Sequence, residues 1–467
     1  MDEFKDKKVV VIGLDPSGSA ASRLLLERGA EVFALAPNGV KTSQIQTFRS
    51  EFPSVNLISE NELPESIDFV VHTSQVSRSI PFLQRLISLG VPVLSDLELS
   101  HRFYSCLSVA ITGTNGKTTT AEILSHMLGA AQRTTLRAGA SGLPLCSVTA
   151  QSKELDFLTL DLNSFQLESV DLFRPAIAVV TNIRPDEMDK YGTIDNYARA
   201  IGNIFKNQQI FDWAIVQSEA LAHFRSLNVP IPSKVITFSA NNRRADIFLD
   251  RGLLISSLSN WSGPLFNMDQ SNLRGPHHAE NVMAALAAGR VLRLKLEEMI
   301  AAVKTYRTGP HRDQLVAESR GVKFINNSKA MNVHATQRSI EALDPAPGGE
   351  PNIWLIAGGV DKGLDYHDLG PLLARRVKGA FLLGEAREKL RSAWSLFTPC
   401  TLVNSLLEAV SRAAENAVAG DVVLLSPACS SLDMFQSYQQ RGEAFREAVN
   451  HLLKNSPVSA DLQYVKC

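Results

Sequence analysis

Two glycines, a lysine and a row of threonines stand together in the stretch AITGTNGKTTTAEIL, residues 110–124. Small residues let consecutive backbone N–H groups converge on phosphate oxygens, and a helix start adds partial positive charge. Lys117 would supply a full positive charge, and the hydroxyl of Thr118 could hold Mg²⁺. The string GxxGK[ST] is two residues shorter than GxxxxGK[ST], because residue 111 is Ile. A plain strand-to-helix turn is the alternative, but the flanking apolar strand and helix favour a phosphate loop.

Acidic residues follow two further predicted strands. Asp161 opens the string DLNSFQLES, and Asp186, Glu187 and Asp189 crowd the string TNIRPDEMDKYGT. The carboxyl ends of strands converge in open α/β sheets, so Asp161 could reach a Mg²⁺ at the phosphate loop. Carboxylate oxygens suit Mg²⁺. A helix N-cap is the alternative for Asp161, and a solvated loop is the alternative for the second string.

The last third of the chain repeats this pattern of polar groups at strand ends. Arg312, in GPHRD, lies at an apparent domain junction and could clamp a phosphate with two hydrogen bonds. Lys329 in INNSKAMNVHAT and Lys362 in AGGVDKG each follow a predicted strand, as does the string LLSPACSSLDMFQSYQQRG. Together these loops could bind a substrate carboxylate.

Alternating strands and helices position all of these strings. Continuous apolar runs such as KKVVVIGL predict strands buried on both faces, and helical runs between them imply parallel sheets. Three such α/β blocks predict three domains, at residues 1–105, 106–307 and 308–467. Residues 235–272 predict a small β excursion within the second block, followed by an alanine-rich helix.

Bulk composition narrows the class of protein. A length of 467 residues allows about three domains. The 47 basic and 48 acidic residues give a net charge of -1, so nothing favours a nucleic-acid partner. Five scattered cysteines form no CxxC pair, which fits a reducing compartment. No stretch approaches the roughly 20 apolar residues of a membrane helix, so we expect a cytoplasmic protein without membrane insertion.

Taken in order, the strings GTNGKTT, SFQLE, PHR, NNSKAMN, GGVDKG and LLSPACSSLDMFQSYQQRG resemble those of the Mur ligase family over essentially the whole chain. The last string is typical of the branch that adds D-glutamate. The resemblance implies a Rossmann-like N-terminal domain for a UDP-linked precursor, a P-loop-type central ATPase with a mainly parallel sheet, and a Rossmann-like C-terminal domain for the amino acid. It also implies a monomer.

The activity that the resemblance implies is amide formation in cytoplasmic peptidoglycan synthesis, which serves the cell wall, cell shape and cell division. ATP with Mg²⁺ would phosphorylate the carboxylate of UDP-N-acetylmuramoyl-L-alanine, and the amine of D-glutamate would attack the acyl phosphate. Catalytic roles fall to Lys117, Lys329 and Asp161. The implied ATP contacts are Gly113, Thr114, Asn115, Gly116, Lys117, Thr118, Thr119, Asn281, Arg312 and Lys329. The implied substrate contacts are Lys362, Ser431, Leu432 and Tyr438, and the implied metal ligands are Thr118, Asp161 and Glu187.

Several positions depart from the family pattern. The family has a Glu at Asp161, a metal-binding His at Glu187 and a carbamylated lysine at Ile201, which Lys206 could replace. The other departures are Ala36 for an acid, Ala140 for Asn, Asn327 for Asp and Met331 for Thr. Two alternatives to the D-glutamate ligase therefore stay open. One is a catalytically impaired paralogue that binds nucleotide or wall precursor, and the other is a Mur-type ligase for a different amino acid.

Overall fold

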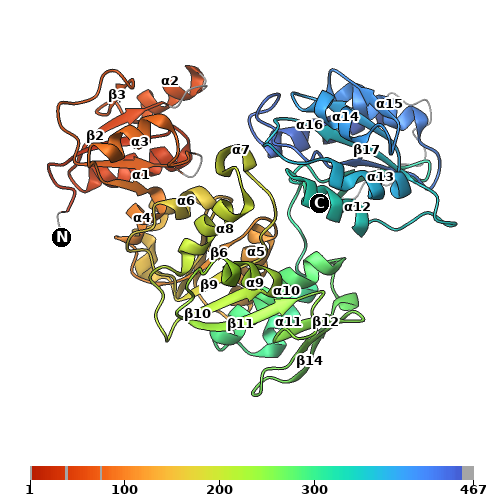
Figure 1. Cartoon of the computed structure of the whole chain (residues 1–467), viewed down its shortest axis with the longest axis horizontal. Coiled ribbons are helices and arrows are strands. Elements are labelled where there is room, and N and C mark those ends of the chain that lie inside the picture. The colour runs from red at the N-terminus through yellow and green to blue at the C-terminus, as the bar shows by residue number, and fades with distance from the viewer. Residues whose placement is uncertain (1–2, 37–39, 41, 74–75, 455–467) are drawn as a thin grey trace. The chain divides into compact units, whose positions relative to one another are not determined.

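The computed structural model describes residues 3–36, 40, 42–73 and 76–454 and contains three β-sheets with helices packed on them (Figure 1). The chain divides into two compact units. One unit comprises Met1–Ile183, Gly192–Asn272 and Pro276–Tyr306, and the other comprises Arg184–Tyr191, Leu273–Gly275 and Arg307–Cys467. The predicted α/β class is confirmed, whereas the three predicted domain ranges stay predictions, and their outer limits at residues 1 and 467 lie outside the described residues.

The first sheet has five parallel strands in the order β3-β2-β1-β4-β5. Alternate side chains of β1 pack on opposite faces: Val9 and Val11 share a hydrophobic core with residues of α1 and α2, and Val10 and Ile12 share another with residues of α3. Burial on both faces explains the continuous apolar run. The strands are β1 (Lys8–Ile12), β2 (Glu31–Leu35), β3 (Asn56–Ile58), β4 (Phe69–His72) and β5 (Val93–Ser95). The helices are α1 (Pro16–Glu27), α2 (Thr42–Glu51), α3 (Pro81–Ser88) and α4 (Asp96–His101).

The second sheet has nine strands in the order β14-β13-β12-β11-β10-β9-β6-β8-β7. Seven of them run parallel, and the predicted β excursion ends in the antiparallel pairs β12–β13 and β13–β14. Because β6 lies between β8 and β9, the loop after β6 leaves the sheet where its neighbours also end.

The strands of the second sheet are β6 (Leu107–Thr112), β7 (Thr135–Gly139), β8 (Phe157–Asp161), β9 (Ile177–Val180), β10 (Trp213–Gln217), β11 (Lys234–Ser239), β12 (Ile247–Asp250), β13 (Leu253–Ser256) and β14 (Gly263–Asn267). The helices of this part of the chain are α5 (Lys117–Ala130), α6 (Ser164–Glu168), α7 (Met188–Tyr191), α8 (Ile194–Gly202), α9 (Ser218–Ser226), α10 (Pro276–Val291) and α11 (Leu296–Thr305). Short 3₁₀ turns are η1 (Leu145–Val148), η2 (Gln151–Glu154), η3 (Asn203–Phe205) and η4 (Met268–Gln270).

The third sheet has six strands in the order β15-β16-β20-β17-β18-β19, all parallel except β15. Helices cover both of its faces, and β20 lies between β16 and β17 (Figure 1). The strands are β15 (Gln314–Ser319), β16 (Val322–Asn326), β17 (Ile353–Gly358), β18 (Val377–Leu383), β19 (Cys400–Leu402) and β20 (Val422–Leu425). The helices are α12 (Val333–Ala342), η5 (His367–Leu369), α13 (Gly370–Arg376), α14 (Arg387–Trp394), α15 (Leu406–Asn416) and α16 (Tyr438–Lys454).

No helix in the described part of the chain has both the length and the apolar character that crossing a membrane requires.

Two buried acids of α4 connect the first sheet to the second. The Glu98 carboxylate is fully buried and accepts hydrogen bonds from three consecutive backbone N–H groups, at residues 171, 172 and 173, over 3.0, 2.8 and 3.1 Å. Asp96 accepts a hydrogen bond from the side-chain amide of Gln166, in α6, at 3.1 Å. Three backbone donors compensate much of the cost of burying Glu98, but Asp96 has fewer donors. Burial raises the pKa of Asp96 to about 7.

We expect Asp96→Asn to gain stability over the wild type as the pH rises. Between the unfolded pKa of 3.8 and the folded pKa of about 7, the folded protein binds a proton that the unfolded chain lacks. The contribution of Asp96 to the free energy of unfolding is therefore present at low pH and lost across that window. Asparagine cannot ionise, so the variant does not lose this contribution. Above about pH 7 its free energy of unfolding, relative to the wild type, should exceed the low-pH difference by about 4 kcal/mol, at about 1.4 kcal/mol per pKa unit. Urea midpoints at about pH 5 and about pH 8 measure it, and a pH-independent difference between the variants would contradict it.

Candidate functional site

The loop between β6 and α5 is shaped by two glycines in the left-handed region. Gly113 has φ 122° and Gly116 has φ 88°. A Cβ atom on Gly113 would lie 2.3 Å from the Thr181 hydroxyl, and one on Gly116 would lie 2.2 Å from the side-chain oxygen of Asn281. Both positions therefore need glycine for backbone conformation and for space. The close approach also brings Asn281, predicted to contact ATP, directly against the loop.

Residues after β9 hold the loop from its other side. Thr181 Oγ1 and Asn182 Nδ2 donate hydrogen bonds to the carbonyl of Asn115 at 2.7 and 2.9 Å. The backbone N–H of Asn115 donates to Asn182 Oδ1 at 3.0 Å. Neither Thr181 nor Asn182 was predicted as a site residue from the sequence. In the sequence they are two polar residues directly after a buried strand. This pattern points to the phosphate loop only when it is known that β9 is a neighbour of β6.

The ammonium group of Lys117 lies over the loop itself. Lys117 Nζ donates to the carbonyls of Gly113 and Thr114 at 2.7 and 3.0 Å. Lys117 is also the first residue of α5, so its charge adds to the partial positive charge of the helix start. A loop with these two sources of positive charge can bind phosphate oxygens.

Asp161 provides a cation-binding group beside the loop. The residue is 3% exposed, and its carboxylate oxygen Oδ2 accepts a hydrogen bond from Thr118 Oγ1 at 2.7 Å. Among the described residues, no donor contacts the buried Oδ1 atom. The alternative role as an N-cap is excluded, because Asn163 caps α6. A buried carboxylate oxygen without a donor, next to a threonine hydroxyl, fits the oxygen ligands that Mg²⁺ takes.

Ser141, which was not among the predicted site residues, contacts both Asp161 and Thr118. Its hydroxyl donates to Asp161 Oδ2, and its Oγ lies 2.9 Å from Thr118 Oγ1. Ser141 stands next to Ala140, the position where the family has Asn.

In the second unit, the loops after β16, β17 and β20 meet, as the strand order requires. Backbone hydrogen bonds join Gly358 N–H to Pro427 C=O and Ala428 N–H to Ala330 C=O, at 2.9 and 3.0 Å. The predicted grouping of strand-end loops is therefore present within this unit.

A buried arginine that was not among the predicted site residues holds the three loops together. Arg441, in α16, is 2% exposed and donates to the carbonyls of Ser328, Cys429 and Gly358 at 2.9, 3.1 and 3.4 Å. Burial lowers the pKa of Arg441 to about 10. It lies inside the predicted string, but its spacing alone does not separate it from a surface arginine.

The predicted substrate residues of this unit differ in their exposure. Ser431 is buried, and Lys329 Nζ lies 5.2 Å from the ring centre of Tyr438, as in a cation–π contact. The Leu432 side chain is 65% exposed. Their roles in binding stay predictions.

Lys362 is paired with acids of the segment Arg184–Tyr191, which belongs to the same unit. Its Nζ lies 3.1 Å from Asp186 Oδ1 and 2.5 Å from Glu187 Oε1. Burial opposes the charge of Lys362, but the two carboxylates raise its pKa overall. Burial also raises the pKa of Glu187, whose backbone has φ 54°. Such a conformation is uncommon for a residue other than glycine and needs surrounding contacts to hold it.

The turn that carries Arg312 is held by one of the departures from the family pattern. His311 and Asp313 both have positive φ, at 65° and 45°. Asn327 Nδ2 donates to Asp313 Oδ1 at 2.8 Å. The asparagine amide can make this bond because it is a donor, whereas a carboxylate at position 327 would face Asp313 with like charge.

Neither position 201, where the family has a carbamylated lysine, nor Lys206 offers a free amine for a carbamate. Ile201, in α8, is fully buried and has no nitrogen to modify. Lys206 Nζ donates to the carbonyl of Val170 at 2.7 Å, so its amine is already engaged there.

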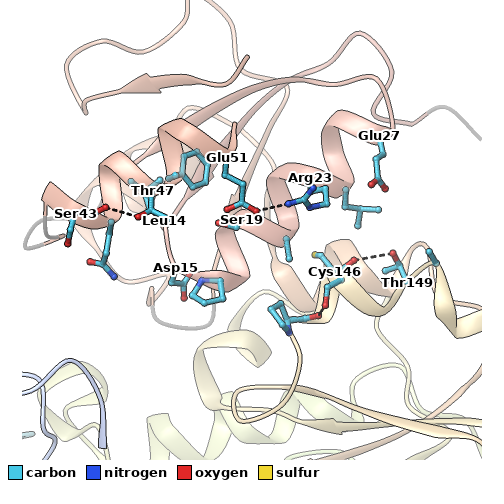
Figure 2. A pocket seen from close by; sticks show the side chains of 18 residues that line it. Leu14, Asp15, Ser19, Arg23, Glu27, Ser43, Thr47, Glu51, Cys146 and Thr149 are labelled. Carbon is cyan, nitrogen blue, oxygen red and sulfur yellow. Dashed lines mark hydrogen bonds and ion pairs between the residues drawn. The ribbon is translucent and has the colours of Figure 1, made fainter. Parts of the chain in front are cut away.

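A groove of about 590 Å³ lies in the first unit along α1, α2 and η1 (Figure 2). One end is formed by Leu14 and Asp15 of the glycine turn after β1. Arg23 and Glu51 also line the groove and form an ion pair with an N–O distance of 2.5 Å. None of the residues predicted for ATP or metal binding lines it.

Sequence comparison matches most of the chain to one family. The sequence model of the Mur ligase middle domain matches residues 111–289, and that of the Mur ligase glutamate ligase domain matches residues 311–429. A UDP-N-acetylmuramoylalanine–D-glutamate ligase from Acidobacterium capsulatum is 36% identical over 461 residues, which cover 96% of this chain and 97% of the relative. The ligase of the same name from Geobacillus kaustophilus is 34% identical over 457 residues, covering 96% and 98%.

Solved structures agree on the fold. The UDP-N-acetylmuramate–alanine ligase from Thermotoga maritima has a TM-score of 0.61 at 16% identity, over 95% of this chain and 99% of that one. The MurF ligase from the same organism, solved with ADP, has a TM-score of 0.59 at 18% identity, over 97% and 96%. With both domain matches and full-length relatives above 30% identity, the chain belongs to the Mur ligase family of ATP-dependent, amide-forming ligases.

Proposed function

We propose that this enzyme joins D-glutamate to UDP-N-acetylmuramoyl-L-alanine, in cytoplasmic synthesis of peptidoglycan precursors. The observation that carries the proposal is the arrangement of Lys117, Thr118 and Asp161 at the start of α5. An ammonium group, a hydroxyl and a buried carboxylate with a free oxygen suit a nucleoside triphosphate with its cation. The relatives with this substrate in their names support the choice of substrates.

The reaction follows from charge and position. A carboxylate oxygen of the muramoyl-alanine attacks the γ-phosphorus of ATP, ADP leaves, and an acyl phosphate forms. The neutral amine of D-glutamate then attacks the acyl carbon, the bond from that carbon to the phosphate oxygen breaks, and the nitrogen gives up one proton to solvent as the amide forms. Lys117 and the backbone N–H groups of the loop neutralise the phosphate charge that builds up during transfer. Thr118 and Asp161 would hold Mg²⁺, which supplies further charge neutralisation.

Residues outside the phosphate loop bind the amino acid and the UDP-linked substrate. Lys362, Ser431, Leu432 and Tyr438 bind the amino acid. The UDP part lies at the glycine turn after β1, where Asp15 accepts a hydrogen bond from Gly18 N–H at 3.0 Å and starts α1.

A catalytically impaired paralogue is the less favoured reading, because the loop, the hydroxyl and the carboxylate are assembled together. A ligase for a different amino acid differs from the proposal only in the second substrate.

The experiment that tests the function is phosphate release from ATP with UDP-N-acetylmuramoyl-L-alanine and D-glutamate. We expect release only when both substrates are present. L-glutamate, L-serine and D-aspartate in place of D-glutamate test the amino acid. Release with another of these and none with D-glutamate would reject the proposed substrate, and none with any would reject the ligase.

We expect Lys117→Ala to lower kcat/KM by about 10³-fold or more, because a fixed charge at the transferred phosphate is lost. Lys295→Ala is the matched control, since that side chain is 77% exposed and pairs only with Glu298 at 3.5 Å among the described residues. Phosphate release and circular dichroism measure activity and fold. Turnover near the wild-type rate in the folded Lys117→Ala variant would remove the phosphate-loop assignment.

We expect turnover to be independent of added bicarbonate. Ile201 offers no amine, and Lys206 is bonded to the Val170 carbonyl. Rates in degassed buffer with and without bicarbonate measure the effect. A several-fold rise in rate on adding bicarbonate would show that a lysine elsewhere carries a carbamate.

We expect Glu187→Gln to lower the KM for D-glutamate several-fold. Two carboxylates now surround the Lys362 ammonium, so an incoming carboxylate competes with them. Removing one negative charge weakens that competition. An unchanged KM together with a lower kcat would instead support the predicted role of Glu187 as a metal ligand.

A further inference from the structure

The turn that follows β7 is pressed against the backbone of Asp161. The N–H of Ala140 donates to the carbonyl of Asp161 at 2.7 Å, and the N–H of Gly139 donates to the carbonyl of Leu143 at 2.9 Å. Gly139 has φ 116°, and a Cβ atom there would lie 2.1 Å from the Asp161 carbonyl oxygen. The position of this turn is therefore set by the same residue whose side chain faces the phosphate loop.

The turn delivers the hydroxyl of Ser141 to one side of that carboxylate. Ser141 and Thr118 both donate to Asp161 Oδ2, and the two hydroxyl oxygens lie 2.9 Å apart. The other oxygen, Oδ1, is buried and receives no hydrogen bond from the described residues. Hydrogen bonds from two donors to Oδ2 restrict the rotation of the carboxylate about the Cβ–Cγ bond. They therefore also fix the position of Oδ1.

We propose that Ser141 is a positioning residue of the cation site: its hydroxyl holds Oδ2 of Asp161, so that Oδ1 stays without a hydrogen-bond donor and can serve as an oxygen ligand for Mg²⁺. The inference rests on the proposed function, because it needs the metal–nucleotide complex. Asp161 is one methylene shorter than the glutamate that the family resemblance places there. A hydroxyl that holds Oδ2 would compensate for this shorter side chain.

Binding of Mn²⁺, a paramagnetic substitute for Mg²⁺, tests the role without turnover. Electron paramagnetic resonance measures free Mn²⁺ in the presence of a saturating nonhydrolysable ATP analogue. We expect Ser141→Ala to bind Mn²⁺ about tenfold more weakly, as is typical when the partner of a metal ligand is removed. Affinity for the analogue in EDTA should stay at the wild-type value, and Ser141→Thr, which keeps the hydroxyl, should restore Mn²⁺ binding.

Ser147→Ala is the matched control, because that exposed serine bonds only the carbonyl of Pro144, at 2.7 Å, among the described residues. It should bind Mn²⁺ as the wild type does. Wild-type Mn²⁺ affinity in Ser141→Ala would overturn the inference and leave the proposed function standing. An equal loss of analogue affinity in EDTA would also overturn it, since the residue would then act only on the loop structure. A wild-type protein without metal-dependent nucleotide binding would overturn both.

A double-mutant cycle with Asp161→Glu tests the coupling between the two side chains. We expect the longer carboxylate to be tolerated better in the Ser141→Ala background, where it can occupy the space of the lost hydroxyl. The two effects on Mn²⁺ affinity should then be non-additive, as for residues in direct contact. Additive effects would show that Ser141 does not act through Asp161.

Discussion

In the first unit, a buried carboxylate that lacks a donor on one oxygen connects the start of α5 to the turn after β7. A charged group removed from water is costly unless hydrogen bonds or a cation replace the lost solvation. Asp161 receives two hydroxyl donors on Oδ2 and none on Oδ1 from the described residues. The loop beside it supplies positive charge for phosphates, so a cation at Oδ1 would complete both sites at once. In the proposed site, one small set of groups would thus serve both the metal and the nucleotide.

Strand order brings these groups together. The site residues lie far apart in the sequence but at the carboxyl ends of β6, β7, β8 and β9, which are neighbours in one sheet: 113–118, 139–141, 161 and 181–182. Glycine at 113 and 116 lets the loop approach the residues after β9 and the Asn281 amide more closely than any side chain would allow. The second unit repeats the principle, because β20 lies between β16 and β17 and their loops meet around the buried Arg441.

Local patterns explain which parts of this arrangement could be predicted from the sequence. Lys117 and Thr118 belong to one contiguous motif, and Asp161 is the last residue of an apolar run. These residues could therefore be predicted without knowing which strands pair. The α/β class and the β excursion followed from apolar periodicity for the same reason. Ser141 and Arg441 act through residues distant in the sequence, and their roles need the strand order. Pattern alone also assigned Glu187 and Lys362 to different ligands, while the folded chain pairs them.

The departures from the family pattern have different meanings once their neighbours are known. Read along the sequence, Ala140 and Asn327 are losses of polar or charged groups. In the fold, the residue after Ala140 contributes a hydroxyl to the Asp161 carboxylate, and Asn327 donates to Asp313 in the turn that carries Arg312. Ile201 differs from these two, because it is fully buried and no polar group of its own replaces the amine. A change that is matched by a new contact preserves the geometry of a site, whereas an unmatched one removes a ligand. By this criterion Asp161 keeps polar partners in a changed arrangement, whereas position 201 offers no amine for a carbamate.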